Sequence, residues 1–360
     1  IFTDEPQLTR QNQFDDVDDN FMLPWTDSLR EKYIEKYGED IVDYLPEIFF
    51  NTDKSGLSRT RYNYHELTTE MFATAFSDQC GEWCENNNIA LTGHILNEGT
   101  LIDQTMAVGD AMRHYRKFTL PGIDMLLAGH EFATAKQVQS AQRQKGAEGI
   151  LCELDGVTNW DFDFRSHKLH GDWQAALGVT MRVPHLAWVS MNGEAKRDYP
   201  ASVSYQAAWY GKYHLIEDYF ARINTILTRG KANCKVAVLH PIRNVWLTMG
   251  TKALTLDFNK KLNDEFDRMT TELVKNHVDF DFICESNLEY QNAHYENGKL
   301  IVENGCYDVL LVPPMFSLKS TTCALLEQAA KENGRVVTFG NAPELVDAIE
   351  SQRTKDIYKL

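Results

Sequence analysis

Two glutamates each stand at the end of a short apolar run, where a buried strand would finish. Glu153 closes the run that begins at Ile150, and Glu5 closes the opening run from Ile1. A carboxylate at such a position is costly to bury unless it forms an ion pair or hydrogen bonds, or has a catalytic or binding role. Cleavage of a glycosidic bond uses two carboxyl groups, one to protonate the leaving oxygen and one to activate water or attack the sugar. We therefore predict that Glu5 and Glu153 face each other across a sugar-binding cleft.

Other polar side chains follow the neighbouring apolar runs. Functional groups collect at the carboxyl ends of parallel strands, so these side chains should converge with the two glutamates. Crowded carboxylates raise one another's pKa, which keeps an acid protonated near neutral pH. The predicted substrate-binding residues are Asp4, His94, Glu98, Asp124, Asp155, Trp160, Arg182, His185, Lys196 and Arg197.

Some of these residues have a second interpretation. His94 and Glu98 carry groups that bind metals, although such residues at strand ends more often position their neighbours through hydrogen bonds. Lys196 and Arg197 either hold sugar hydroxyls or pair with nearby acids. The residues by themselves require no cofactor, and they do not determine whether a metal ion is bound.

The pattern that must position these groups is a regular alternation of strands and helices. Alternation with apolar strands predicts a parallel sheet. Five units are too few for an eight-stranded barrel, so we predict that residues 1–230 are the later part of a (β/α)8 barrel, with Glu5 on its fourth strand and Glu153 on its seventh. An open doubly wound sheet is the alternative.

The first residue is not Met and lies inside a strand-like run, so we expect an upstream segment or a partner chain to complete the barrel. The predicted strands lie at 1–5, 89–96, 121–126, 149–153 and 179–189, and the predicted helices between them include 62–86, 101–118, 133–145, 166–177 and 205–227.

A second run of alternating elements begins near residue 234. We predict that residues 231–360 form a smaller α/β domain, which ends with a helix over 343–350. It contains no G-x-S-x-G elbow, no G-x-G-x-x-G and no P-loop. A binding or assembly role, with a homo-oligomer as one option, is therefore favoured over a second active site.

The composition narrows the class of partner. The formal net charge of the 360 residues is -16, which argues against nucleic acid and anionic membrane surfaces, because both attract basic patches. A neutral small molecule or glycan fits this charge. Seven cysteines without framework spacing predict free thiols in a reducing compartment, hence a cytoplasmic protein.

An ordered series of short motifs resembles the barrel of bacterial α-L-rhamnosidases of glycoside hydrolase family 106 and their relatives. The resemblance covers residues 1–230 and implies an inverting hydrolysis, with Glu5 as general acid and Glu153 as general base. It also implies calcium as a candidate ion. The stretch after Glu153 differs from the smaller, Gly-rich turn of the relatives, so the resemblance does not determine which sugar is bound. The motifs are Phe2-Thr-Asp-Glu-Pro6, Thr92-Gly-His94, Pro121-Gly-Ile-Asp124, Cys152-Glu153 with Trp160, Asp172-Trp-Gln174, Gly178-Val179 and Lys196-Arg-Asp-Tyr-Pro200.

Residues 231–360 are similar to the flavodoxin-like, class I glutamine-amidotransferase-like domain that follows the barrel in several β-galactosidases. In those proteins the domain lacks the amidotransferase nucleophile and helps subunits to associate, which implies an assembly role here.

Two alternatives stay open. The first is a retaining β-glycosidase of the β-galactosidase type, with Glu5 as acid/base and Glu153 as nucleophile. A carboxyl separation of about 5–5.5 Å is typical of retaining enzymes and about 6.5–9.5 Å of inverting ones. The second alternative is a non-catalytic carbohydrate-binding or assembly protein, in which the two glutamates would not converge.

Overall fold

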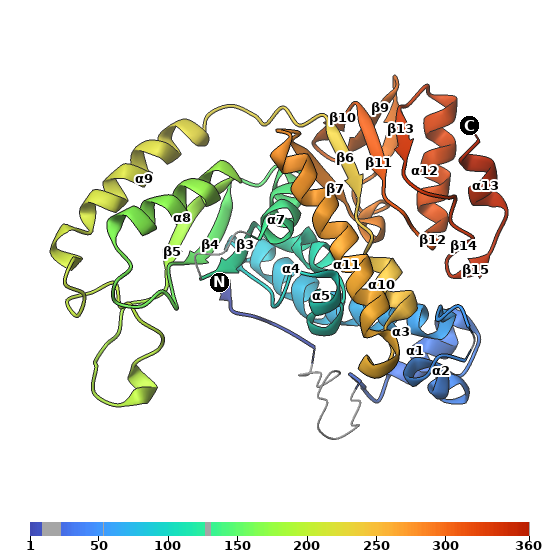
Figure 1. The fold of residues 1–360 in the computed structure, drawn as a ribbon, viewed down its shortest axis with the longest axis horizontal. Helices are drawn as coiled ribbons and strands as arrows, with labels where there is room; N and C mark the ends of the chain where they lie inside the picture. Colours follow the sequence, from blue (N-terminus) through green and yellow to red (C-terminus); the bar gives the residue numbers. More distant parts are fainter. Residues whose placement is uncertain (9–22, 53, 127–130, 360) are drawn as a thin grey trace.

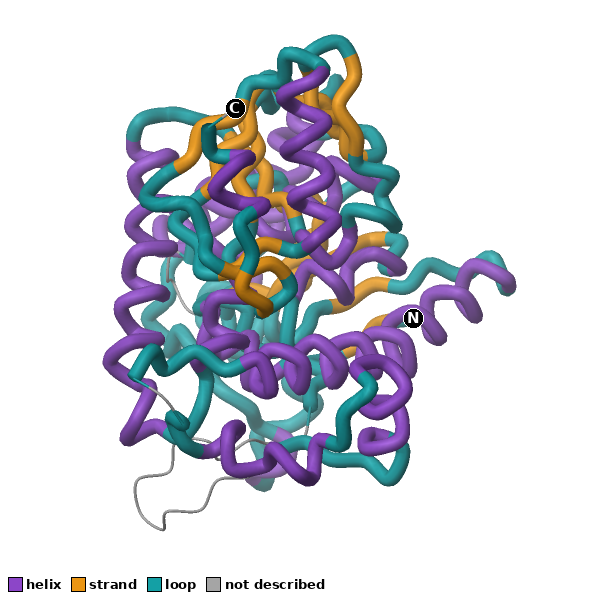
Figure 2. The backbone as a smooth tube through the Cα atoms, turned by 90° about the vertical axis from the view of Figure 1, so that its right-hand side faces the viewer, coloured by secondary structure: helices purple, strands orange, loops and turns teal. Residues whose placement is uncertain are grey.

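Two parallel sheets, with helices between and around them, organise the chain (Figure 1). The structure is a computed structural model that describes residues 1–8, 23–52, 54–126 and 131–359. The amino terminus lies beside the first sheet, and the carboxyl terminus lies beside the second (Figures 1 and 2).

The first sheet contains the predicted strands in chain order, all parallel. Its described strands are β1 (Phe2–Thr3), β2 (Thr92–Gly93), β3 (Leu120–Met125), β4 (Ile150–Leu154) and β5 (Val179–Pro184), paired as β1-β2-β3-β4-β5. Parallel pairing of consecutive strands requires the intervening helices to cross over the sheet. The predicted α/β class and parallel sheet are therefore confirmed.

The second strand is much shorter than the predicted run over 89–96. Gly93 has φ +124°, a value that L side chains rarely adopt. Strand β2 therefore ends at Gly93, and His94, whose amide still bonds to β1, begins the loop that carries the site.

The helices around the first sheet are shorter and more broken than predicted. The expected helix over 101–118 is interrupted because Gly109 takes φ +81° and the Asp110 side chain then caps the next helix by accepting from the Met112 amide at 3.1 Å. The expected helix over 205–227 begins only at His214. The helices are α1 (Leu29–Tyr37), α2 (Leu45–Phe49), α3 (Arg59–Phe72), α4 (Gln79–Asn86), α5 (Leu101–Ala107), α6 (Ala111–His114), α7 (Phe132–Lys145), α8 (Phe164–Ala176) and α9 (His214–Leu227), with a π-helical segment (Ala73–Asp78) joining α3 to α4.

The second sheet has the order β13-β11-β6-β7 and is also parallel. If β6, β7, β11 and β13 are numbered 1 to 4 in chain order, the sheet reads 2-1-3-4 from its β7 edge. Flavodoxin-like folds have this strand order. Its strands are β6 (Val236–Leu239), β7 (Phe280–Ile283), β11 (Val309–Val312) and β13 (Val336–Thr338), and the helices are α10 (Ile242–Thr248), α11 (Lys252–Lys275), α12 (Ser320–Lys331) and α13 (Arg353–Ile357). An antiparallel meander, β8 (His294–Glu296), β9 (Lys299–Val302) and β10 (Gly305–Tyr307), accompanies it.

The predicted closing helix over 343–350 is wrong. That segment is a hairpin of β14 (Leu345–Val346) and β15 (Ile349–Glu350), with β14 paired to β12 (Ser317–Leu318). Asp347 and Ala348 have φ +49° and +62°, as the central residues of a tight two-residue hairpin turn require.

Helix α7 joins the two sheets, since it lies between them (Figure 1). The Ser140 hydroxyl accepts from the Phe282 amide at 2.7 Å, and the Gln144 amide donates to the Phe282 carbonyl at 2.8 Å. One apolar cluster includes Tyr62 and Leu101 together with Val238 from β6. The predicted boundary near residue 230 therefore separates two sheets that share part of one core.

In the described part of the chain, no helix combines the length and the apolar character needed to cross a bilayer. All seven cysteines lie within the described ranges and are free thiols.

We expect Gly93→Ala to destabilise the first sheet. An added Cβ would lie 2.1 Å from the Thr3 carbonyl oxygen and 2.6 Å from the Thr3 nitrogen, so β1 would have to move. The free energy of unfolding, measured in urea, should fall by about 3 kcal/mol or more. Gly193→Ala is the control, because Gly193 has φ +84° with nothing within 4 Å. It should cost about 1 kcal/mol from backbone strain alone. Equal losses would contradict the close approach of β1.

Candidate active site

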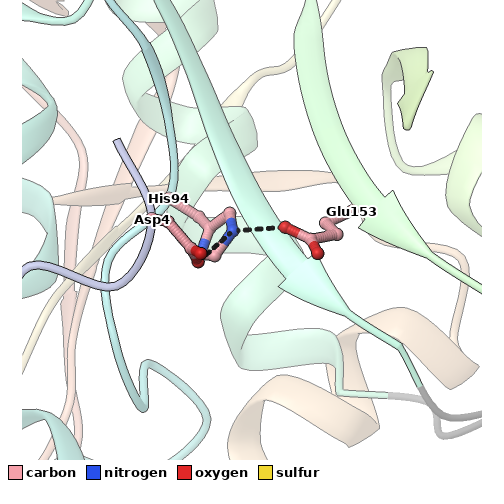
Figure 3. A group of neighbouring side chains, drawn as sticks. All are labelled: Asp4, His94 and Glu153. Carbon is pink, nitrogen blue, oxygen red and sulfur yellow. Dashed lines mark hydrogen bonds and ion pairs between the residues drawn. The ribbon is translucent and has the colours of Figure 1, made fainter. Parts of the chain in front are cut away.

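The side chains of Asp4, His94 and Glu153 meet at the carboxyl edge of the first sheet (Figure 3). His94 Nε2 lies 2.8 Å from Glu153 Oε2 and 3.6 Å from Asp4 Oδ1. The His94 side chain is fully buried, whereas 16% of the Glu153 side chain and 72% of the Asp4 side chain are exposed. A buried imidazole thus holds a glutamate whose carboxylate still reaches solvent.

The strands bring these residues together although they are far apart in the sequence. Asp4 follows β1, His94 follows β2 and Glu153 lies on β4. The His94 amide donates to the Thr3 carbonyl at 3.2 Å, which continues the β1–β2 pairing. Parallel strands in register end at the same edge, so side chains there face a common space.

The fourth member of the group is Asp124 on β3, which is the register partner of Glu153. Burial, opposed by His94 and reinforced by the charges of Glu153, Glu5 and Asp4, raises the pKa of Asp124 to about 7. Burial also disfavours a charged His94, but the hydrogen bond with Glu153 and the nearby carboxylates outweigh it and raise the pKa of His94.

Glu5 belongs to the same electrostatic group, since its charge acts on Asp124. Its side chain is exposed and its backbone has φ +47°, an uncommon conformation for a residue other than Gly, Asn or Asp. Among the described residues, no hydrogen bond or ion pair joins the Glu5 carboxylate to another side chain.

Glu98 lies behind this group, in the protein interior. It is buried and accepts a hydrogen bond from the Tyr115 hydroxyl at 3.1 Å. Burial raises the pKa of Glu98 to about 8. Glu98 is therefore largely a neutral acid at pH 7.

Asp155 and Arg182, both predicted to bind substrate, are engaged by protein partners. Asp155 is buried, with its oxygens 3.1 Å from His167 Nδ1, 3.1 Å from His170 Nδ1 and 3.3 Å from an Arg182 nitrogen. Burial works against ionisation, but these partners hold the pKa of Asp155 at about 2. Arg182 also pairs with Glu217 at 3.0 Å. This ionised cluster fixes the loop after β4, in which Asp155 and Val157 have φ +68° and +56°.

His185 connects the site to the loop after β5. Its Nε2 lies 4.0 Å from Glu153 Oε1 and 3.5 Å from Asp198 Oδ2. The Pro200 carbonyl accepts from the Thr158 amide at 3.0 Å, so the loops after β4 and β5 are tied together beside Glu153.

Two aromatic rings and two cations lie on these same loops. The half-exposed Trp160 ring meets the edge of the buried Trp188 ring, with centroids 5.2 Å apart. Lys196 and Arg197 are exposed, and among the described residues neither forms an ion pair.

Sequence reasoning missed His167, His170, Trp188 and Asp198. The spacing of the two histidines was a usable signal, because positions three apart share one face of a helix. Trp188 and Asp198 lie in an irregular loop, where no periodicity indicates a direction.

Asp4, His94 and Glu153 carry the atoms that could ligate a metal ion. The ligand atoms of Asp4, His94 and Glu153 lie within 4.8 Å of one another. Calcium takes six to eight oxygen ligands, whereas this group offers two carboxylates and an imidazole. The hydrogen bond between His94 and Glu153 accounts for the cluster without an ion. The residues do not fit the calcium that the resemblance implies.

Comparisons with known proteins find similar folds in several enzymes that act on carbohydrates. No family model matches the chain. A curated protein of Formosa agariphila, described as a "Putative beta-glucuronidase", is 20% identical over 341 residues, which are 92% of this chain and 27% of that protein. The rhamnosidase of Novosphingobium sp. PP1Y aligns over 93% of this chain and 31% of its own, with a TM-score of 0.63 and 15% identity.

Two further solved structures give similar values. A β-galactosidase from Bacillus circulans sp. alkalophilus has a TM-score of 0.57 and 14% identity, over 91% of this chain and 50% of its own. An exo-carrageenase from Bacteroides ovatus has a TM-score of 0.60 and 10% identity, over 90% of this chain and 47% of its own. These glycoside hydrolases have TIM-barrel folds. At such identities the likeness is one of fold, and the chain spans about half or less of each protein's length.

The buried Glu98 should make stability depend on pH. Its folded pKa of about 8 lies above the ordinary value, so folding binds a proton that the unfolded chain releases. Stability is therefore present at acid pH and lost as the pH rises from about 5 to about 8, by up to about 4 kcal/mol.

Glu98→Gln removes this titration and keeps an acceptor for Tyr115. Urea unfolding between pH 5 and 8 should show a flatter dependence for the variant. Glu31→Gln on the exposed face of α1 serves as the control and should retain the wild-type slope. An unchanged slope in Glu98→Gln would contradict the neutral buried acid.

Proposed function

We propose that the protein is a glycoside hydrolase that cleaves a glycosidic bond with Glu5 and Glu153. The observation that carries the proposal is the meeting of Glu153, His94 and Asp4 at the carboxyl edge of a parallel sheet. Active sites of (β/α)8 barrels lie at this edge. The fold likeness to a rhamnosidase and to β-galactosidases supports the same class of reaction.

The proposed mechanism is an inverting hydrolysis. The Glu5 carboxyl group gives its proton to the glycosidic oxygen as the bond to the anomeric carbon breaks. Glu153 takes a proton from a water molecule whose oxygen attacks that carbon from the opposite face. The hydrogen bond between His94 and Glu153 orients the carboxylate, leaving its other oxygen for water. One proton is consumed and one is released, so the two carboxyl groups exchange protonation states.

An α-L-rhamnoside is the proposed substrate class, by the resemblance of the motif series and the fold likeness to a rhamnosidase. A β-galactoside or a β-glucuronide is the second candidate. The specific observation for a β-glucuronide is the pair of exposed cations, Lys196 and Arg197, which directly precede Asp198 and its contact with His185. A sugar carboxylate could pair with either cation.

We further propose that an upstream segment or a partner chain completes the barrel. Strands β1 and β5 end the described sheet, and open sheet edges invite pairing. On β5 itself, Met181 is 46% exposed, which is unusual for a strand whose two edges are both paired within a closed barrel. The amidotransferase-like unit over 231–360 is proposed to assist assembly. A particle of one 41.3 kDa chain by light scattering would count against both a partner and a homo-oligomer.

Removing either glutamate's charge should abolish hydrolysis. Glu5→Gln and Glu153→Gln are each expected to lower kcat by at least about 100-fold, the usual contribution of a positioned acid or base. The assay uses 4-nitrophenyl α-L-rhamnoside, β-D-galactoside and β-D-glucuronide. Glu31→Gln is the matched control on an exposed helix face. Wild-type activity in both variants would contradict the proposed roles of the two glutamates. If the protein cleaves no glycoside even together with the segment or partner chain that completes its barrel, the result would favour a non-catalytic carbohydrate-binding protein.

The stereochemical course separates the two hydrolytic mechanisms. For an inverting enzyme, proton NMR of the first-formed sugar should show the anomer opposite to that of the substrate. For the retaining alternative it should show the same anomer, because Glu153 would then form a covalent glycosyl ester that water cleaves in a second displacement.

A further inference from the structure

Asp124 is a polar group of the candidate active site to which the proposed mechanism assigns no role. It lies on β3 directly beside Glu153 on β4, in the register Asp124–Glu153. Neighbouring strands are about 4.8 Å apart, and register partners project from the same face of the sheet. Any sugar ring held against Glu153 would therefore also pass close to Asp124.

One oxygen of this carboxyl group has no evident partner. Asp124 Oδ1 is buried, and within the described ranges nothing forms a hydrogen bond with it. Buried polar atoms in native proteins nearly always have a partner, and leaving one unsatisfied costs about 1–3 kcal/mol. Glu153, by contrast, is already held by His94 at 2.8 Å. Asp124 Oδ1 is therefore available to a group of a bound ligand.

The charges around Asp124 decide which protonation state would meet that ligand. Three carboxylates act on it, those of Glu153 from β4 and of Glu5 and Asp4 after β1, and they oppose its ionisation together with burial. His94 after β2 is the facing group that favours ionisation. A bound sugar would remove further water and disfavour the charge still more.

We propose that Asp124 binds substrate as a neutral carboxylic acid, donating a hydrogen bond to a sugar hydroxyl beside Glu153, and that its ionisation contributes to the loss of activity at alkaline pH. The inference rests on the proposed function, which it deepens by assigning a role to a third carboxyl group. A neutral acid also avoids placing another negative charge beside the carboxylate that must activate water.

The proposal predicts opposite results for two substitutions. Asp124→Asn keeps a neutral hydrogen-bond donor of the same shape, so at pH 6 its kcat/KM on the cleaved 4-nitrophenyl glycoside should stay within about threefold of wild type. Asp124→Ala removes the donor and should lower kcat/KM by about 10- to 100-fold, mainly through KM.

The pH profile gives the sharper test. Wild-type kcat/KM should fall as the pH rises through about 7, because the donor loses its proton. The ratio of Asp124→Asn to wild-type kcat/KM should rise between about pH 6 and 9, because loss of the Glu5 proton affects both proteins alike whereas only the wild type loses the Asp124 proton. Asp43→Asn, on an exposed turn, should reproduce the wild-type profile. The proposal is overturned if kcat/KM falls as much in Asp124→Asn as in Asp124→Ala. It is also overturned if kcat/KM of Asp124→Asn declines with rising pH in the same way as that of the wild type.

A measurement without substrate separates this inference from the proposed function. Carbon-13 NMR of aspartate-labelled protein should show one carboxyl group titrating near neutral pH in the wild type and not in Asp124→Asn. If no glycoside is hydrolysed, the proposed function fails. If glycosides are hydrolysed but this titration is absent, only the role of Asp124 fails.

Discussion

The close approach of β1 to Gly93 is the contact on which the candidate site depends. Only a residue without a Cβ can lie against the Thr3 backbone at this point, and the His94 amide then donates to the Thr3 carbonyl. That pairing sets Asp4 beside His94. The parallel pairing of β2 with β3 and of β3 with β4 then brings Asp124 and Glu153 to the same edge.

The electrostatic consequence is a crowded acidic edge around one buried imidazole. His94 offsets part of the repulsion and anchors Glu153, while Asp124 is left with a pKa of about 7. The second cluster, around Asp155, behaves differently because Arg182 and two histidines stabilise its charge. Two neighbouring carboxylates on one strand end, Glu153 and Asp155, thus have distinct environments. One is open to a ligand and the other is fixed as part of the scaffold.

The two sheets are bound together by more than a linker. The buried Arg243 from α10 pairs with the partly buried Glu66 of α3 at 2.6 Å, and α7 contacts both sheets. Breaking a buried pair of this kind costs about 3–5 kcal/mol. The second unit therefore supports the helices that lie behind the site, which gives it a physical role irrespective of any assembly function.

The amino-acid sequence by itself determined the alternation of strands and helices, the parallel pairing and the strand-end positions of Glu5, His94, Asp124 and Glu153. These features depend on apolar runs and turn residues, whose signals are local. The helix expected over 343–350 failed because pairing with Ser317–Leu318 overrides local preference.

Only the tertiary structure decided which side chains share a partner. It assigned Asp155 and Arg182 to a buried ionic cluster with His167 and His170, and brought Asp198 to His185. Such contacts depend on distances between segments far apart in the chain. Packing of the whole sheet fixes those distances, and no pattern within one segment contains them.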